Sequence, residues 1–412
     1  MRGVMYSKKR SDFWKKVASI VSVILLLLAW YGGSTRITDN QSGMVDQLLI
    51  KGDLLNQIDD RLYEGRIPNN LNPVEYIGLG SGIGYGGMTE VAVTVSSLGE
   101  IQRIAVLSSK DTSSYLDKVI QSNLMEKLLG ENIKSNFEID GVSGATISTN
   151  ALTEAIKRAA DPVRVELFDI NRAVNEKPIS YFRWLDLMAI VMFTMAILVN
   201  KTRHRKKSMF NWAIMLTSMC VFGFYSSSLF SSSTMGILIS GTWLSGLGNY
   251  TSLILLSLVI LYIIATNKNV YCNTLCPFGA TQECLAKLGN TKTISLTPVF
   301  FEWFPRGLLL VTLCLGLYYR NPASFSYEPF GIMFGMIGSI YLFVLTTVTI
   351  VTSLVVKRPW CRTLCPMNPM TDFIRFNRQW FKSMLNKHLA KREIMEANQM
   401  ADAAVKSNEV SK

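Results

Sequence analysis

The chain has 412 residues, of which 49% are hydrophobic and 17% charged, and its mean hydropathy is +0.24. This apolar balance excludes an ordinary soluble protein of this length. The net charge of +12 first suggests nucleic-acid binding, but residues 32–180 hold 14 Lys and Arg against 20 Asp and Glu, which is 14 − 20 = −6. The positive charge lies beside apolar segments instead, so we expect no nucleic-acid partner.

Six apolar segments approach the roughly 20 residues that a helix needs to cross a bilayer core of about 30 Å. They are Phe13–Tyr31, Tyr181–Asn200, Met209–Phe230, Tyr250–Thr266, Trp303–Tyr319 and Phe330–Val356. Lys and Arg cluster at alternate ends of these segments, whereas residues 231–249 contain neither. The positive-inside rule therefore predicts a multi-pass protein of the cytoplasmic membrane, in contact with its lipid, with both termini in the cytoplasm.

The predicted domain order follows from these segments. A basic cytoplasmic N-terminus (1–12) and a transmembrane anchor (13–31) precede an extracytoplasmic domain (32–180). A five-helix membrane domain (181–366) and a basic, amphipathic cytoplasmic tail (367–412) follow. We expect the first part of the tail to lie on the inner leaflet as a helix and the chain after Asn398 to fray.

The extracytoplasmic domain has the pattern of an α+β fold. Thr89–Ser96 alternates apolar and polar residues, and Ile101–Ser108 follows a Leu-Gly turn as a second strand. We expect a helix from Asp111 to Leu129, a strand near Ile133–Ile139 and a helix over Asn150–Ala160. The domain has no cysteine, so no disulfide supports it.

A glycine run, Gly78–Gly87, contains one G-x-G-x-x-G match. A dinucleotide-binding fingerprint must follow a strand and open a helix. This run precedes a strand, so we interpret it as a flexible loop that lets the backbone approach a ligand.

The hexapeptide C-x-T-L-C-P occurs twice, as Cys272–Pro277 and Cys361–Pro366, each time after a long apolar run. Both cysteines of the pair repeat with one spacing, since 361 − 272 and 365 − 276 both equal 89. Four thiolates complete the ligand set of an iron–sulfur cluster, and C-x₃-C-P closes a bacterial ferredoxin motif. Zinc also accepts four cysteines, and buried free thiols are the alternative without metal.

The membrane domain has the pattern of an internal duplication. Met209–Pro277 and Arg306–Pro366 each contain two apolar segments and end in the hexapeptide. Two like halves would bring the four cysteines together at one membrane face, which the charge pattern makes cytoplasmic. With two histidines in the chain, one in a basic loop and one in the tail, a bis-histidine haem is disfavoured.

A second motif, Asp140-Gly-Val-Ser143-Gly144-Ala145-Thr146, lies in the extracytoplasmic domain. Its predicted place between a strand and a helix leaves backbone N–H groups free for a phosphate. The same hydroxyl residues also suit a turn and a helix N-cap, so both interpretations stay open.

Residues Gly84–Ala160 resemble the extracytoplasmic FMN-binding domain of Na⁺-translocating quinone reductase, Rnf complexes and NosR/NirI proteins. In that domain a D-x-x-[ST]-G-A-T motif accepts FMN through a phosphoester on its last threonine, placed there by a flavin transferase. The resemblance implies covalent FMN on Thr146, with Asp140 required for transfer and Ser143, Gly144 and Ala145 completing the motif.

The whole chain resembles a polytopic α-helical membrane protein of the NosR/NirI type, with the FMN domain inserted after the first of six helices. It is most similar to the short PceC/RdhC-like flavoproteins encoded with reductive dehalogenases, because no cysteine follows Cys365. This resemblance implies an electron carrier. Its electrons would come from the quinone pool, from an iron–sulfur centre for which the 4Fe-4S type is favoured, or from both. They would pass through FMN to an extracytoplasmic reductase such as a reductive dehalogenase. Whether it also oxidises quinol as an enzyme stays open, and the alternative is a redox-sensing regulator or a maturation factor for an exported metalloenzyme.

Overall fold

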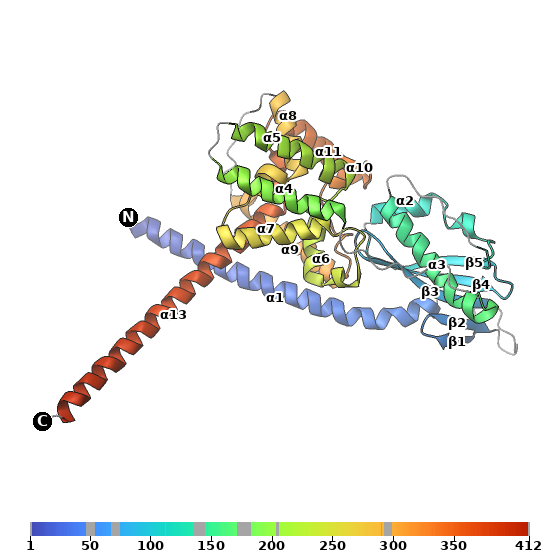
Figure 1. Ribbon diagram of the computed structural model, residues 1–412, viewed down its shortest axis with the longest axis horizontal. Helices are drawn as coiled ribbons and strands as arrows, with labels where there is room; N and C mark the ends of the chain where they lie inside the picture. Colours follow the sequence, from blue (N-terminus) through green and yellow to red (C-terminus); the bar gives the residue numbers. More distant parts are fainter. Residues whose placement is uncertain are drawn as a thin grey trace.

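The computed structural model describes residues 2–46, 54–66, 75–111, 113–135, 145–170, 183–202, 206–289, 291 and 299–410. A domain built on a β-sheet, here called the sheet domain, lies at one end of a bundle of helices, the helical domain (Figure 1). The N-terminus and the free end of the last helix lie at the opposite end of the molecule (Figure 1). This arrangement matches the predicted order of an inserted α+β domain between two helical parts.

The sheet is an antiparallel meander of five strands in the order β1-β2-β3-β4-β5. The strands are β1 Leu54–Asp59, β2 Leu62–Arg66, β3 Glu75–Ile83, β4 Met88–Ser96 and β5 Ile101–Ser109. Strands β4 and β5 confirm the predicted hairpin, with Val93 paired to Ile104. Helix α3 (Thr146–Phe168) covers β3 and β4 and closes a core that includes Val91, Leu152 and Ile156.

The first half of the glycine run is part of a strand, so its interpretation as a flexible loop was wrong. Gly78, Gly80 and Gly82 alternate along β3 and face α3. A Cβ atom on Gly80 would lie 2.2 Å from the carbonyl oxygen of Ala155, inside any permitted contact. The glycines let the helix backbone approach the strand closely, which is a packing role.

Two of the expected helices have different bounds. The helix expected over 111–129 is instead the helix α2, Ser113–Gln121, and the short 3₁₀ helix η1, Glu126–Leu128. Helix α3 begins four residues before the expected start and continues through Pro162, because its buried face packs on the sheet beyond that residue. Of the strand expected near 133–139, residues 136–139 lie outside the described residues; before them, Asn132 makes an isolated bridge to Glu100.

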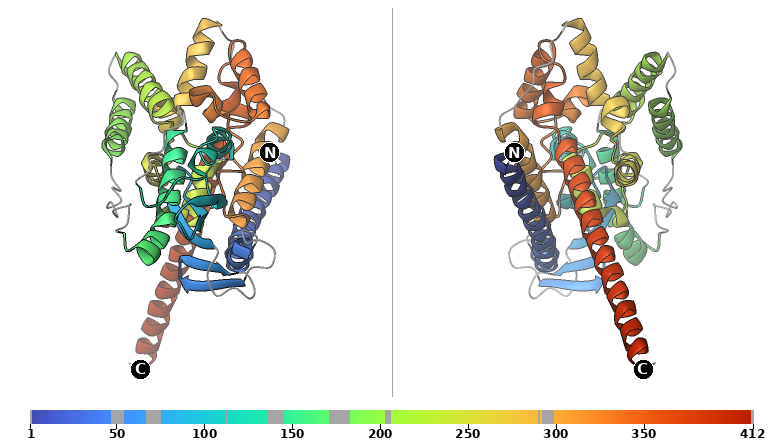
Figure 2. Two further views of the ribbon diagram at one scale, coloured as in Figure 1. Left: turned by 90° about the vertical axis from the view of Figure 1, so that its right-hand side faces the viewer. Right: turned by 90° about the vertical axis from the view of Figure 1, so that its left-hand side faces the viewer.

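The helical domain and the two terminal helices contain the remaining elements. In chain order they are α1 Arg2–Asp46, α4 Trp184–Lys201, α5 Lys207–Ser218, the π-helix η2 Met219–Tyr225, α6 Ser232–Ser240, the 3₁₀ helix η3 Thr242–Ser245, α7 Thr251–Thr266, the π-helix η4 Tyr271–Leu275, α8 Pro277–Leu288, α9 Val299–Tyr318, α10 Phe330–Gly335, α11 Ile340–Ser353, α12 Pro359–Thr363 and α13 Met367–Val410. Helix α1 packs beside α9, as Figure 2 shows, and α13 is one helix to Val410 without the expected fraying after Asn398.

Within the part of the chain that the structure describes, three helical segments are long and apolar enough to cross a membrane. They are Phe13–Thr35, Trp184–Lys201 and Lys207–Tyr225. Three shorter apolar helices, Thr251–Thr266, Trp303–Tyr318 and Ile340–Ser353, occupy the other predicted positions. A 16-residue helix is about 24 Å long, which is less than a bilayer core of about 30 Å.

The sixth predicted segment, Phe330–Val356, is broken into α10 and α11. Met336 takes a left-handed conformation with φ +55, and Gly338 follows with φ +159. These backbone angles end one helix and redirect the chain before the next one begins at Ile340. The hydrophobic run therefore contains a turn, which its composition did not show.

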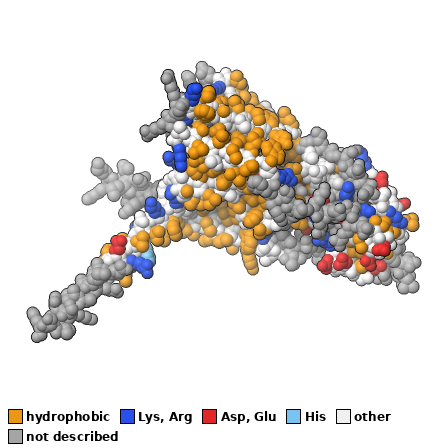
Figure 3. All heavy atoms as spheres, viewed as in Figure 1, with side chains coloured by type: hydrophobic (Ala, Val, Ile, Leu, Met, Phe, Trp, Pro, Cys, Tyr) orange, Lys and Arg blue, Asp and Glu red, His pale blue; other side chains and the backbone are white. Residues whose placement is uncertain are grey.

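The two halves of the helical domain repeat one order of elements. In the first half, a long helix (α5 with η2), a short helix (α6) and a second apolar helix (α7) lead to a cysteine turn (η4) and a further helix (α8). The series α9, α10, α11, α12 and α13 has the same order. The surface of the helical domain is widely hydrophobic, whereas acidic side chains gather on the sheet domain (Figure 3).

Candidate functional site

Each cysteine motif forms a tight turn that leads into a helix. After α7 ends, the chain turns back and forms η4, which carries Cys272. Cys276 is the N-cap of α8, and Pro277 occupies the first turn, where its missing N–H costs nothing. Cys361 lies in α12, and Cys365-Pro366 likewise immediately precedes α13.

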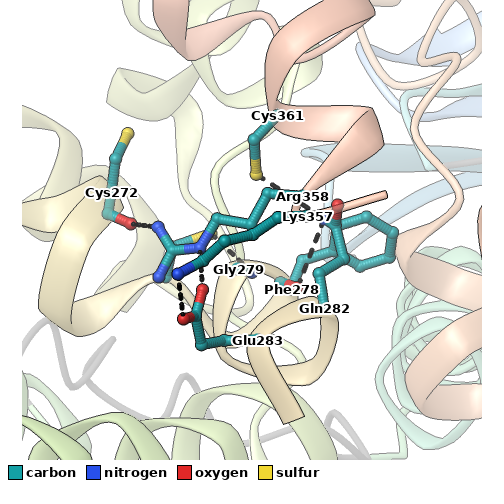
Figure 4. A network of polar contacts seen from close by, with 9 residues as sticks. Cys272, Phe278, Gly279, Gln282, Glu283, Lys357, Arg358 and Cys361 are labelled. Carbon is teal, nitrogen blue, oxygen red and sulfur yellow. Dashed lines mark hydrogen bonds and ion pairs between the residues drawn. The ribbon is translucent and has the colours of Figure 1, made fainter. Parts of the chain in front are cut away.

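The two motifs meet inside the helical domain. Cys272, Cys276 and Cys365 pack against the same buried cluster of side chains, which includes Tyr271 and Met367. The fourth thiol, Cys361, lies beside α8 of the other half (Figure 4). The duplication therefore brings both pairs to the junction between the halves, as the sequence predicts.

Polar N–H groups already point at three of the sulfur atoms. Asn269 Nδ2 lies 3.3 Å from Cys272 Sγ, the Gly279 N–H group donates to Cys276 Sγ at 3.4 Å, and Gln282 Nε2 lies 3.5 Å from Cys361 Sγ. Thiolates that bind a cluster commonly accept such bonds, which tune the reduction potential of the cluster. The surroundings of the cysteines thus fit an iron–sulfur centre.

The sulfur atoms are nevertheless not arranged as a closed ligand set. Among the described residues, no group of three or more Cys, His, Asp or Glu side chains is placed to hold a metal ion. Cluster ligation by Cys272, Cys276, Cys361 and Cys365 thus stays a prediction from the sequence. The other three cysteines are free as well, and Cys220 is exposed.

An ion-pair network ties the first motif to the segment before the second (Figure 4). Arg358 donates from Nε to Glu283 at 2.8 Å and from Nη1 to the carbonyl oxygen of Cys272 at 3.1 Å. Lys357 Nζ lies 2.8 Å from the other oxygen of Glu283. Both cations precede Cys361, so α8 and the second cysteine turn are held in one position.

The first cysteine turn contacts the middle of a candidate membrane helix. The Ser218 hydroxyl donates to the carbonyl oxygen of Leu275, next to Cys276, at 2.5 Å. Ser218 stands near the middle of the candidate span Lys207–Tyr225. Tyr271, beside Cys272, packs edge-on against Phe230, with ring centroids 4.5 Å apart. The turn after α7 thus packs against α5 and Phe230, contacts that the cysteine spacing alone did not predict.

The residues of the flavin motif are only partly described. Asp140, Ser143 and Gly144 lie outside the described residues, while Ala145 is the N-cap of α3 and is buried. Thr146 is the first residue of α3, and its side chain is exposed. The threonine hydroxyl is thus accessible at a helix N-terminus, where N–H groups are free for a phosphate.

Asp111, where the sequence predicts the start of a helix, is instead a buried residue beside the first turn of α3. Its carboxylate accepts the Gly86 N–H group and the Ser148 hydroxyl, each at 2.7 Å. It thereby joins the glycine loop between β3 and β4, residues 84–87, to the first turn of α3. Burial raises the pKa of Asp111, and the bonds from Gly86 and Ser148 oppose this rise. Sequence patterns carried little signal for this role, because Asp111 lies two residues after β5 and its partners, Gly86 and Ser148, are distant in the chain.

We expect Asp111→Ala to destabilise the sheet domain by about 1–3 kcal/mol for each buried donor left without an acceptor. Because the pKa of Asp111 is raised in the folded state, wild-type stability should fall as pH rises above the ordinary carboxyl pKa. Above the raised pKa the loss is complete. Thermal unfolding of the full-length protein at several pH values measures both effects, and Asp111→Asn, which cannot ionise, should lack this part of the pH dependence.

The start of α3 and the glycine loop dock on the helical domain. The Gly248 N–H group donates to the carbonyl oxygen of Gly84 at 2.8 Å, and the Tyr85 hydroxyl donates to that of Ser227 at 3.2 Å. Burial in this contact raises the pKa of Tyr85 to about 12. A Cβ atom on Gly248 would lie 2.7 Å from the side chain of Ile147, the neighbour of Thr146. The predicted flavin attachment residue therefore lies beside this interface.

A segment of the second half, Ser326–Gly335, connects this interface to the cysteines. At one end, a Cβ atom on Gly331 would lie 3.4 Å from the hydroxyl of Tyr115 in the sheet domain. At the other, Tyr327 donates from its hydroxyl to the carbonyl oxygen of Leu364, next to Cys365, at 3.0 Å. Phe330 packs on Phe278, whose ring lies 6.0 Å from that of Trp360. The segment thus touches the sheet domain and both cysteine turns.

Comparisons with known families agree with this arrangement. Residues 84–161 match the FMN-binding domain, and residues 249–294 and 330–387 match the 4Fe-4S binding domain. Both pairs of cysteines fall inside the second match. No curated protein matches the chain. The chain thus combines an FMN-binding domain with a 4Fe-4S binding domain and candidate membrane helices, an architecture consistent with the NosR/NirI type, which points to a redox protein that transfers electrons.

Proposed function

We propose that the protein is a membrane electron-transfer flavoprotein. It takes electrons from quinol, from the iron–sulfur centre at the four cysteines, or from both in turn. It passes them to FMN bound covalently at Thr146 and on to an extracytoplasmic acceptor such as a reductive dehalogenase. The N- and C-termini lie in the cytoplasm, and the sheet domain lies on the outer side of the cytoplasmic membrane.

One observation carries this proposal: the segment Ser326–Gly335 touches Tyr115 of the FMN-binding domain and packs on both cysteine turns. A flavin and a cluster on opposite faces of an apolar layer of about 30 Å would exchange electrons very slowly. The contact of the first cysteine turn with the middle of a candidate membrane helix supports a shorter path than a full crossing. The contacts of Ser326–Gly335 with both domains support electron exchange within one chain.

The residues at the two centres have distinct roles in this proposal. Thr146 offers its exposed hydroxyl to a flavin transferase, which recognises Asp140, Ser143, Gly144 and Ala145. Asp111 holds the glycine loop against the first turn of α3, and the Gly248 contact seats this edge on the helical domain. When bound, FMN and a cluster supply one- and two-electron chemistry that side chains lack.

We expect Thr146→Val to abolish covalent flavin while leaving the fold intact, because valine has the shape of threonine without its hydroxyl. The protein is expressed with a flavin transferase, denatured in SDS and assayed for flavin fluorescence in the gel. A matched control is Thr149→Val, since Thr149 is buried and bonds the carbonyl oxygen of Ala145. A fluorescent Thr146→Val band would refute covalent attachment at this residue.

Depletion from cells separates the carrier from a sensor or maturation factor. A carrier predicts immediate loss of quinol-driven reduction of the acceptor enzyme, even where that enzyme is already mature. Continued activity of mature acceptor after depletion would contradict the carrier and favour a role in maturation.

A further inference from the structure

A cavity of about 650 Å³ lies between α1, α6, α7, α9 and α13. Its interior is apolar and includes Leu26, Leu256, Leu309 and Met370. Its charged residues are Lys15, Arg306, Asp372 and Arg375, on α1, α9 and α13. Volumes of 300 to 1,000 Å³ are about the usual size of a small-molecule site.

The charged end of the cavity has both a cation and a carboxylate. Arg306 Nη2 lies 3.1 Å from Asp372 Oδ2, and the Asp372 side chain is 53% exposed. Beside them, the Ser19 hydroxyl donates to Asn377 at 2.8 Å, joining α1 to α13. This end can hold a polar head group and release protons to water, while the apolar interior accepts a hydrocarbon tail.

The start of α13 separates the cavity from the cysteines. Pro369, Met370 and Phe373 line the cavity, whereas the buried Thr371 faces the opposite way. Asn269 Nδ2 lies 3.0 Å from Thr371 Oγ1 and 3.3 Å from Cys272 Sγ. Met370 packs against the same buried cluster as Cys272, Cys276 and Cys365. The barrier is thus one helix, which is about 10–12 Å in diameter.

We propose that this cavity binds an isoprenoid hydroquinone, with its ring beside Arg306 and Asp372 and its tail among the leucines. Oxidation of one hydroquinone to the quinone releases two electrons and two protons. The electrons would pass one at a time across α13 to a cluster held by the four motif cysteines, and both protons would leave through Asp372 to water. The electron step rests on the proposed function; the binding site does not.

The occupant is a hydroquinone rather than an acyl chain of a phospholipid because of where the cavity lies. Its wall on α13 carries a hydrogen-bonded link to Cys272, which a structural lipid would not use. The guanidinium groups of Arg306 and Arg375 are also engaged, since Arg306 pairs with Asp372 and Arg375 donates to the carbonyl oxygen of Asn267. A phosphate would have to compete with both contacts.

The test uses the holoprotein in nanodiscs and a photoreactive azidoquinone. We expect labelled peptides from α1, α9 and α13, and a loss of labelling by about tenfold or more when Leu309→Trp fills the cavity. Val311→Trp, on the same helix but 55% exposed, is the matched control and should label normally. Ser22→Phe fills the cavity from α1 and is the second test variant, used if Leu309→Trp does not fold.

Labelling elsewhere, or unchanged labelling in both filled variants, would overturn the site. The proposal would also be overturned if phospholipid displaced the azidoquinone as effectively as unlabelled quinone does. That result would identify a lipid cavity. Flavin reduction is measured in parallel with quinol and with dithionite. A wild-type cavity that labels while quinol fails to reduce the flavin would support the site and refute the proposed electron route.

Discussion

Replacing any one of Cys272, Cys276, Cys361 and Cys365 by serine is expected to remove the iron–sulfur centre. Changing only an outer partner of a ligand costs about 10–100-fold in metal affinity, and loss of a ligand should cost at least as much. The four thiols come from both halves of the domain, so each variant leaves an incomplete set. Iron and sulfide content and the visible spectrum of protein purified without oxygen measure the effect.

The chain offers three matched controls for this prediction. Cys220, Cys284 and Cys314 are also free thiols, and none belongs to a C-x-T-L-C-P motif. Their serine variants should keep full iron and sulfide. If a motif variant retains the cluster, the four-cysteine ligand set is wrong, and if zinc replaces iron in the wild type, the centre is structural.

Replacing Gly80 by valine should prevent folding of the sheet domain. A Cβ atom there would lie 2.2 Å from both the Ala155 carbonyl oxygen and the Ala159 nitrogen. Overpacking a core costs typically 1–3 kcal/mol, and a clash with backbone should cost at least about 3 kcal/mol because no rotamer relieves it. The free energy of unfolding of small domains is about 5–15 kcal/mol, so the Gly80→Val clash removes much of it.

The control is Ser81→Val, on the next residue of the same strand, whose side chain points to the other face of the sheet. Limited proteolysis of the full-length protein and covalent flavin loading report on the domain. Gly80→Val should be cleaved between residues 54 and 170 and carry no flavin, whereas Ser81→Val should resemble the wild type. Normal flavin loading in Gly80→Val would show that α3 does not pack as closely as described.

The features that sequence patterns predicted are those set by local periodicity. Alternation over Thr89–Ser96 and its partner strand identified the β4–β5 hairpin, and apolar composition located α4 and α7. The identical spacing of the hexapeptides predicted that the two halves meet at the cysteines. The match to an FMN-binding domain over 84–161 supports the flavin, which the sequence suggested only through resemblance.

The features that sequence patterns missed depend on contacts between distant segments. Glycines are typical of loops, but pairing with β2 and β4 makes Gly78 and Gly80 part of a strand, and the close approach of Ala155 explains why glycine is needed there. The break after Gly335 needs a left-handed Met336, which no composition rule predicts. The packing of the first cysteine turn against α5 depends on Ser218 meeting Leu275, 57 residues later in the chain.

Arg358 has a consequence for the biogenesis of the protein. It holds Glu283 and the carbonyl oxygen of Cys272, both from the first half, although it belongs to the second. The first cysteine turn therefore lacks this support until the ribosome has made the segment after α11. With the proposed four-cysteine ligand set, cluster insertion is a late event that follows synthesis of nearly the whole chain, and a truncated product would expose an unsupported thiol pair to oxidation.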